Sequence, residues 1–376
     1  MKNKSSIIIP LLVFAVAAQV VPHIYAQAAD QHAVFAKTNS VEGNQIIAYF
    51  RAPNGSLIEG NHFATGGRGS GGTTDPLGSQ GSLILSQDHS LLFAVNPGTG
   101  DISVFRVNGA NLQLIQVVSS GGSAPVAIAQ HGNLVYVINF AGNSNVVGFH
   151  LDEDGHLAMI PNSIRFLSAT NTGASSLAFS PDGRFLLVTE KVTNNIDVFS
   201  VNSDGSLSQP AFTPDPIPGV FDVVFSNDGA ALILQTGGSR TTNASTVSSY
   251  LVQDGGTLVP VTGSVPTLGT FACWIALTPD GQFAFASNTL TSSISGFAIG
   301  GSGTVTALPG TVVASLPTGA TNLDIAVSDD AKFVYTMNTG AGTIGIFALQ
   351  PNGSLKTIGF ASGLSANSGF EGLAAF

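Results

Sequence analysis

The chain has 376 residues, of which 44% are hydrophobic and 9% are charged, and it contains 45 glycines. Because disordered chains are poor in apolar residues, this composition excludes a disordered protein and favours an all-β fold with many tight turns. The formal net charge is −10, and the 12 Lys and Arg residues are scattered. The sequence therefore predicts no nucleic-acid partner.

The first 28 residues have the pattern of a secretory signal peptide. Two lysines precede an apolar run over residues 7–21, and Ala26 and Ala28 fit a small-residue cleavage site. The alternative, a retained membrane anchor, is weaker because the run is short for a bilayer span. We therefore expect an exported protein, periplasmic or extracellular, that has no membrane insertion after signal removal. Its mature part, residues 29–376, is expected to be a single domain.

One sequence phrase then recurs along the chain. Each copy has an apolar strand, a tight turn such as Ser-Pro-Asp-Gly, a second and a third strand, another turn, and a weaker fourth strand. A polar residue ends the first strand of each copy: Ser86, Gln130, Ser180, Ser226, Thr278 and Ser328. Asp-Gly and Asn-Gly supply the positive φ that tight hairpins need, so each copy is predicted to be four antiparallel strands.

The two ends of the mature chain complement each other. Residues 33–57 supply a second strand, a third strand and a closing turn, whereas residues 369–376 supply a first strand with nothing behind it. Six complete units and this composite one predict an all-β, seven-bladed β-propeller. Pairing of the C-terminal strand with the N-terminal strands would close the ring and remove exposed sheet edges. A pair of β-sandwiches would explain neither the period nor the complementary ends.

The repeat is clearest in "SPDGRFLLVTEKVTNNIDVFSVNSDGSL", residues 180–207. This segment resembles the lactonase family of seven-bladed propellers, which includes 6-phosphogluconolactonases and carboxymuconate-cyclising enzymes. It is also similar to the broader propellers named for a Tyr-Val-Thr-Asn strand. The resemblance extends over nearly the whole mature chain and implies a propeller that acts on a lactone or a related acid.

That resemblance also directs attention to one blade. The family's catalytic blade carries Pro-Arg-His before a first strand and Asn-Glu at the end of the next strand. Here Ser175 and Ser176 occupy the Arg and His positions, and Glu190 and Lys191 occupy the Asn and Glu positions.

Ligands of propellers usually bind over the central channel, so residues just before the first strands are candidates. Three carboxylates, Asp222, Asp324 and Glu371, fall at similar places in three blades. Converging carboxylates raise one another's pKa and make a general acid or base, so these three are the predicted catalytic residues. They could instead hold a hard cation such as calcium, or accept hydrogen bonds from neighbouring backbone amides.

Ligand contacts are expected from further residues at the same rim: Ser175, Ser176, Glu190, Lys191, Trp274 and Asn322. Trp274 could stack on a sugar or aromatic ring, or it could pack into the channel. Lys191 could bind an acidic ligand, or it could be a solvated loop lysine paired with Glu190. Residues 66–72, "GGRGSGG", are predicted to be a loop between blades because no helix follows them.

The sequence thus predicts an exported lactonase-family protein that hydrolyses or cyclises a small lactone or a sugar or aromatic acid at the channel mouth. The alternative is a catalytically degenerate propeller that binds a small molecule, a glycan or a protein partner in the cell envelope. Because Cys273 is the only cysteine, no internal disulfide forms. No cofactor is required, although a divalent cation such as calcium is an open alternative, and a monomer that binds a small-molecule ligand is expected.

Overall fold

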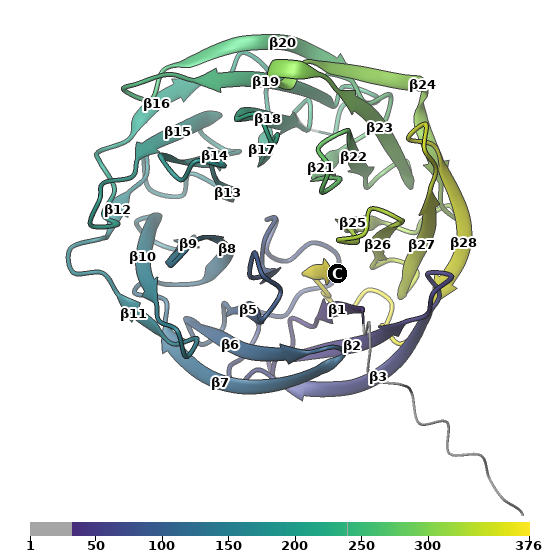
Figure 1. Ribbon diagram of the computed structural model, residues 1–376, viewed down its shortest axis with the longest axis horizontal. Coiled ribbons are helices and arrows are strands. Elements are labelled where there is room, and N and C mark those ends of the chain that lie inside the picture. Colours follow the sequence, from purple (N-terminus) through teal and green to yellow (C-terminus); the bar gives the residue numbers. More distant parts are fainter. Residues whose placement is uncertain (1–31, 239) are drawn as a thin grey trace, which may run out of the picture. The chain divides into compact units, whose positions relative to one another are not determined.

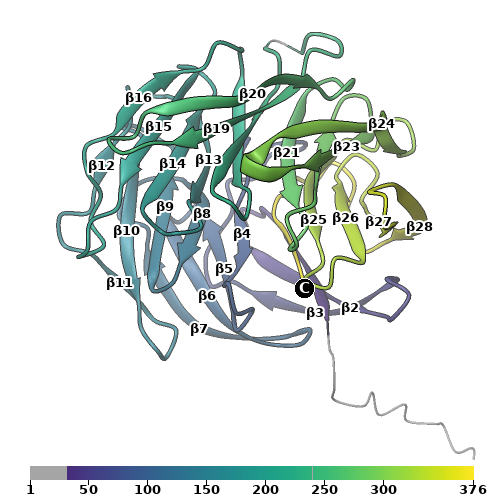
Figure 2. The same cartoon turned by 45° about the horizontal axis from the view of Figure 1, so that its top comes forward.

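The repeats of the sequence form seven antiparallel sheets around a ring, six of them with four strands and one with a short fifth strand (Figure 1). A computed structural model describes residues 32–238 and 240–376. The expected signal peptide lies outside the described residues. Within each sheet the strands follow one another from the ring axis outward, and the tilted view shows the outer strands along the circumference of the ring (Figure 2). The predicted fold class is therefore confirmed.

The strands of the first four sheets have the following bounds. The closing sheet contains β29 (Leu373–Ala375), β1 (Ala33–Lys37), β2 (Gln45–Arg51) and β3 (Leu57–Ala64). The next sheet contains β4 (Leu83–Leu85), β5 (Leu91–Asn96), β6 (Asp101–Asn108) and β7 (Asn111–Ser119). The third contains β8 (Pro125–His131), β9 (Leu134–Asn139), β10 (Asn145–Leu151), β11 (Leu157–Met159) and the short β12 (Arg165–Phe166) beside β10. The fourth contains β13 (Ala174–Phe179), β14 (Phe185–Glu190), β15 (Asn195–Ser200) and β16 (Ala211–Pro214).

The remaining three sheets repeat this order. They contain β17 (Val220–Phe225), β18 (Ala230–Gln235), β19 (Thr246–Val252) and β20 (Leu258–Pro266). Then come β21 (Ala272–Leu277), β22 (Phe283–Asn288), β23 (Ser293–Ile299) and β24 (Val305–Ser315). Last are β25 (Asn322–Val327), β26 (Phe333–Asn338), β27 (Thr343–Leu349) and β28 (Leu355–Ala361). A single 3-10 turn, η1 (Gly301–Gly303), is the only helical element in the described part of the chain. No helix there has the length and apolar character of a membrane span.

The recurring turn is held by its own side chains. After β13, the Ser180 hydroxyl donates to Asp182 Oδ1 at 2.6 Å, and Ser180 Oγ accepts from the Phe185 amide at 3.0 Å. Gly183 has a φ of 69°, which an L side chain rarely adopts. The same Ser/Thr–Asp bond recurs at Ser86–Asp88, Ser226–Asp228, Thr278–Asp280 and Ser328–Asp330. The repeated sequence phrase is therefore a hairpin whose polar residues satisfy the turn backbone.

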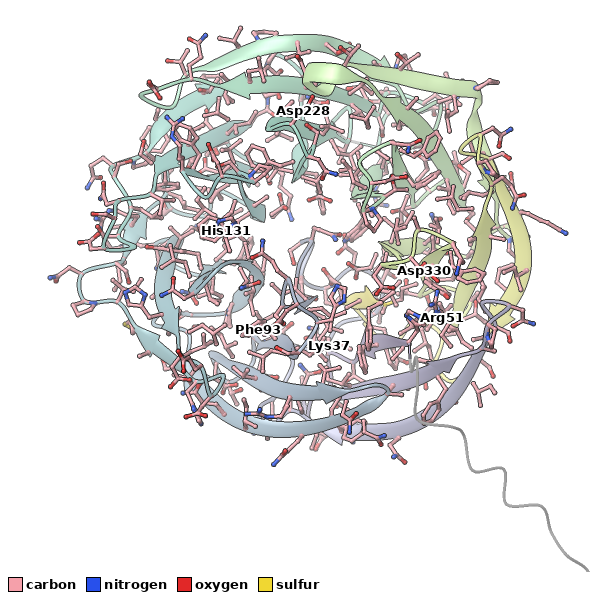
Figure 3. The ribbon with its side chains drawn as sticks, in the orientation of Figure 1. Lys37, Arg51, Phe93, His131, Asp228 and Asp330 are labelled. Carbon is pink, nitrogen blue, oxygen red and sulfur yellow. The ribbon has the colours of Figure 1, made fainter. Side chains whose placement is uncertain are left out.

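The ring closes as the sequence predicts. Strand β29 pairs antiparallel with β1, with Ala374 opposite Phe35, and the Phe376 amide donates to the Ala33 carbonyl at 3.0 Å. Arg51 of β2 makes two 3.0 Å hydrogen bonds to the Asp330 carboxylate of the neighbouring sheet (Figure 3). Backbone pairing between β29 and β1 thus completes the closing sheet. The buried Arg51 guanidinium then joins this sheet to the last sheet.

Apolar residues fill the space between neighbouring sheets. Tyr49 of the closing sheet packs with Tyr335 and Met337 on one side, and Phe35 packs with Leu92 on the other side. Neighbouring sheets cover both faces of each sheet, which is why the inner strands have nearly continuous apolar sequences. Some of the buried polar side chains lie where the first strands begin and the second strands end, and these are considered next.

Candidate functional site

The first strands begin, and the second strands end, at the same rim of the ring. Residues 65–82, which join β3 to β4, cross the channel at this rim (Figure 1). The Gln80 amide donates to the Ser175 carbonyl at 2.8 Å, and Ser79 Oγ donates to the Val126 carbonyl at 2.9 Å. Leu77 is buried in the same apolar cluster as Val126. We name residues 65–82 the mouth segment, because its contacts with several sheets cover this end of the channel.

Glu371 holds the mouth segment in place. Its carboxylate accepts the Leu77 amide at 2.8 Å and the Ser79 amide at 3.1 Å. Burial raises the pKa of Glu371 well above its usual range, and the charges of Asp75 and Asp324 raise it further. This predicted catalytic carboxylate is fully buried and is bonded to backbone donors.

The other two predicted catalytic carboxylates have similar surroundings. Asp222 accepts the Ser176 hydroxyl at 2.7 Å and the Ile275 amide at 2.9 Å, and burial raises its pKa to about 7. Asp324 accepts the Gly372 amide at 2.6 Å, and burial likewise raises its pKa to about 7. Asp222 and Asp324 thus join neighbouring sheets, and Glu371 holds the mouth segment, so the catalytic role of all three stays a prediction.

Lys37 is a buried cation that the sequence reading did not single out. It ends β1 beside the channel (Figure 3), it is fully buried, and its Nζ has no hydrogen-bond partner among the described residues. Burial lowers the pKa of Lys37 to about 8, although the charges of Glu371 and Asp324 act in the opposite direction. The channel wall near the ring closure therefore contains one amine between two carboxyl groups.

Several predicted ligand-binding residues are also enclosed. Trp274 is fully buried, its indole donates to the Ser79 carbonyl at 3.0 Å, and its ring meets Phe221 edge-on at 5.4 Å. Of the two readings of Trp274, packing into the channel is the one the structure favours. Ser175 donates to the Phe221 carbonyl at 2.6 Å, and Asn322 donates to the Ser293 carbonyl at 3.0 Å. Ser176 bonds Asp222 and lines a cavity of about 310 Å³ together with residues of the opposite hairpin turns.

Glu190 belongs to a polar repeat at the ends of the second strands. In three other sheets an amide at this position donates to a serine of the third strand: Asn96 to Ser103, Gln235 to Ser248 and Asn288 to Ser295. In the fourth sheet, Glu190 and Asp197 take these two places. Glu190 accepts the Ser168 amide at 2.9 Å and the hydroxyls of Ser168 and Thr193.

Asp197 is the unusual member of this pair. It is fully buried, and neither of its carboxyl oxygens has a hydrogen-bond partner among the described residues. Burial and the neighbouring Glu190 charge raise the pKa of Asp197 to about 9. Asp197 therefore carries a proton at neutral pH, in the place where other sheets have a serine hydroxyl.

Lys191 lines an open cavity instead of pairing with Glu190. Its ammonium donates to the Gly78 carbonyl and lies 5.1 Å from the centre of the Phe221 ring. A Cβ added to Gly78 would lie 2.5 Å from Lys191 Nζ and 3.9 Å from Asp75 Oδ1, so these two charged groups are neighbours. The cavity beside them has a volume of about 500 Å³.

A second cavity has a volume of about 350 Å³, and Asp75 and Phe271 line both cavities. Arg240 lines the second cavity and lies over Phe271, with 5.5 Å between the guanidinium carbon and the ring centre. Burial raises the pKa of Asp75, while the charges of Lys191 and Arg240 lower it. We name the two cavities the Lys191 cavity and the Arg240 cavity.

Sequence reasoning missed Asp75 and Arg240 because neither belongs to the repeat. The one signal for Asp75 was the length of the glycine-rich segment that contains it, since long connections in compact domains are often functional. Among residues 32–238 and 240–376, no group of three or more His, Cys, Asp or Glu side chains is arranged to hold a metal ion.

The model of one protein family, "Lactonase, 7-bladed beta-propeller", matches residues 28–170 and 247–365. This chain belongs to the lactonase family. A curated 6-phosphogluconolactonase from Pectobacterium atrosepticum is 23% identical over 283 residues, which cover 71% of this chain and 80% of that protein. The lactonase family thus accounts for most of the sequence outside residues 171–246.

Solved structures with the same fold are equally distant in sequence. The periplasmic gluconolactonase PpgL of Pseudomonas aeruginosa is 21% identical, with a TM-score of 0.67 over 90% of this chain and 98% of that one. A protein from Lactobacillus plantarum is 19% identical, with a TM-score of 0.72 over 92% of this chain and all of that one. These similarities support the fold of this lactonase-family member and carry no argument about its activity.

Proposed function

We propose that this lactonase-family propeller hydrolyses a small lactone at the mouth of its channel. The observation that carries the proposal is the placement of Asp75 beside Lys191 and within the electrostatic reach of Arg240, where two cavities open. A carboxyl group with a raised pKa next to fixed cations is a common arrangement for proton transfer coupled to stabilisation of an oxyanion. The family membership supports lactone chemistry in particular.

In the proposed reaction, Asp75 acts as the general base. It takes a proton from a water molecule while the water oxygen bonds to the lactone carbonyl carbon, and the Lys191 ammonium stabilises the oxyanion that forms. The ring C–O bond then breaks, and the proton held by Asp75 passes to the leaving alkoxide. The products are a hydroxy acid and the regenerated carboxylate. Arg240 would hold an acidic substituent of the substrate, if one is present.

The second candidate function is ligand binding without catalysis. It is favoured by Ser175 and Ser176, which stand where the family carries Arg and His, and whose hydroxyls are both engaged with the protein. Under this proposal the same cavities bind a small molecule, a glycan or a segment of a protein partner.

A lactone panel at neutral pH tests the two functions. We expect turnover by the wild-type protein, and a loss of at least about a hundredfold in kcat/KM for Asp75→Asn and for Lys191→Met, since general bases contribute about this much. Matched controls are Asp254→Asn and Lys356→Met, which change exposed residues away from the mouth. Thermal stabilisation by a ligand without any turnover would overturn the enzymatic proposal in favour of binding.

The earlier expectations for Asp222, Asp324 and Glu371 are tested in the same assay. If these residues are structural, Asp222→Asn, Asp324→Asn and Glu371→Gln lower the unfolding temperature and leave kcat/KM of the folded fraction unchanged. A loss of kcat without a loss of stability would restore their predicted catalytic role.

We further propose that the mature protein is exported to the periplasm or the extracellular space and acts there as a monomer without a resident metal. The leader pattern of residues 1–28 supports export. A leader that is not removed, activity that EDTA abolishes, or a dimer in analytical ultracentrifugation would each refute one part of this proposal.

A further inference from the structure

We propose that the Lys191 cavity takes an apolar ring, and that the preferred substrate is a lactone fused to or substituted with an aromatic or alkyl group. This inference rests on the proposed function, and it adds the chemical class of the substrate. A polyhydroxylated sugar lactone is the class that it disfavours.

The walls of the Lys191 cavity are mainly apolar. Side chains of Val192, Pro218, Phe221 and Phe271 line it, and Gly219 adds bare backbone. Its volume of about 500 Å³ lies within the ordinary range for small-molecule sites. A cavity of this size with two phenylalanine rings in its wall suits a ligand about the size of a bicyclic aromatic lactone.

Each of the two rings has a cation over its face. Phe221 has the Lys191 ammonium over its face and Trp274 at its edge, and Phe271 has the Arg240 guanidinium over its face. An aromatic wall with cations beside it favours a flat apolar ligand whose polar end reaches the cations. The ring of the ligand would lie against Phe221 or Phe271, and its ester group would lie near Lys191.

The polar groups of the cavity have little hydrogen-bonding capacity left for hydroxyls. Asn194 points its amide at the protein: Nδ2 donates to the carbonyls of Asp215 and Ile217 at 2.8 and 3.1 Å. Its Oδ1 accepts the amides of Gly219 and Val220. Asn194 is therefore saturated, although it lines the cavity.

The Thr236 hydroxyl also lines the cavity, and the rest of the hydrogen-bonding capacity is concentrated near one point. Lys191 uses one ammonium proton on the Gly78 carbonyl, and Asp75 Oδ1 accepts the Gly78 amide at 2.9 Å. The free protons of Lys191 and the second oxygen of Asp75 can serve the reacting ester group. A sugar lactone would in addition bury several ring hydroxyls against apolar walls, and each unpaired hydroxyl lowers the affinity about tenfold.

The test compares three lactones that share a six-membered ring: dihydrocoumarin, which is aromatic, δ-valerolactone, which is unsubstituted, and glucono-δ-lactone, which is hydroxylated. With spontaneous hydrolysis subtracted, we expect kcat/KM for dihydrocoumarin to exceed that for glucono-δ-lactone by at least about a hundredfold, from two or more unpaired hydroxyls. The Val192→Ser variant changes an exposed wall residue and should reduce this ratio about tenfold, because it adds a hydroxyl partner. The matched control is Leu290→Ser, which makes a similar change in the wall of the Arg240 cavity and should leave the ratio unchanged.

The outcomes separate this inference from the proposed function. Faster turnover of glucono-δ-lactone would overturn the inference and leave the lactonase proposal standing. If no lactone is turned over, calorimetric binding of the ring-opened acid of dihydrocoumarin to the wild type, lost in Lys191→Met, would support the apolar ligand class and overturn the catalytic proposal. The absence of both turnover and binding would overturn both.

Discussion

The buried carboxyl group of Asp197 predicts a specific dependence of stability on pH. In other sheets a serine at this position donates to the protein, as Ser103 does to the Thr65 carbonyl at 2.7 Å and Ser295 does to the Thr267 carbonyl at 2.6 Å. Asp197 can donate in the same way only while it is protonated. We therefore expect Asp197→Ser to stabilise the protein at alkaline pH, where the wild-type carboxyl group tends to lose its proton.

The magnitude follows from the two pKa values. The folded-state pKa of Asp197 is about 9, whereas an unfolded Asp titrates near its ordinary value of about 4. Because the folded pKa is raised, the folded state holds the proton more tightly, and stability is lost as the pH rises from about 4 to about 9. Each pH unit in this range costs about 1.4 kcal/mol. Between pH 5 and pH 8 the free energy of unfolding of the wild type should therefore fall by roughly 4 kcal/mol more than that of Asp197→Ser.

Urea unfolding measures this difference directly. Trp274 is the only tryptophan and is fully buried, so its fluorescence reports on the folded state. Free energies of unfolding of the wild type and of Asp197→Ser should diverge as the pH rises. Asp254→Asn, which changes an exposed carboxylate, is the control and should follow the wild type. Parallel curves for the wild type and Asp197→Ser would refute the assignment of a proton to Asp197.

Three further predictions concern the ring itself. Arg51→Ala should cost about 2 kcal/mol in urea unfolding, because it removes two hydrogen bonds between a guanidinium and the Asp330 carboxylate; an unchanged midpoint would contradict this. Ala331→Gly should raise the unfolding temperature by about one degree, because φ of Ala331 is 53° and glycine removes a strain of about 1 kcal/mol; a lower unfolding temperature would show that the turn is not strained. Deleting residues 373–376 exposes the edge of β1, so the truncated protein should form dimers or aggregates in size-exclusion chromatography; a stable monomer would disprove the role of β29 in protecting that edge.

The fold could be predicted from the sequence because its signals are local and repeated. Each Ser-x-Asp-Gly turn fixes a hairpin through its own side chains, as the Ser180–Asp182 bond shows. The complementary sequences at the two ends then predicted that both ends belong to one sheet. The pairing of β29 with β1 confirms this prediction. Local rules repeated in most of the blades were sufficient for this level of structure.

The candidate site could be predicted only in part, because it depends on contacts between segments distant in the sequence. The positions of Glu371 and Lys191 in the repeat predicted that both residues lie at the same rim, and they do. The mouth segment, which covers Glu371 and brings Asp75 to Lys191, has no repeat that would reveal its path. Lys37 was missed for another reason: a lysine at a strand end is usually exposed, and only the closed ring buries it between carboxyl groups.

The sharing of one sheet between both ends of the chain has a consequence for biosynthesis. Six sheets are each made from one continuous stretch, so each can assemble soon after its own residues leave the ribosome. The closing sheet contains residues 33–64 and residues 373–375, so its first strands remain without their inner neighbour until residues 373–375 have been synthesised. The circle is therefore completed only after residues 373–375 have left the ribosome, and a nascent chain that lacks them exposes an open sheet edge to chaperones and to other chains.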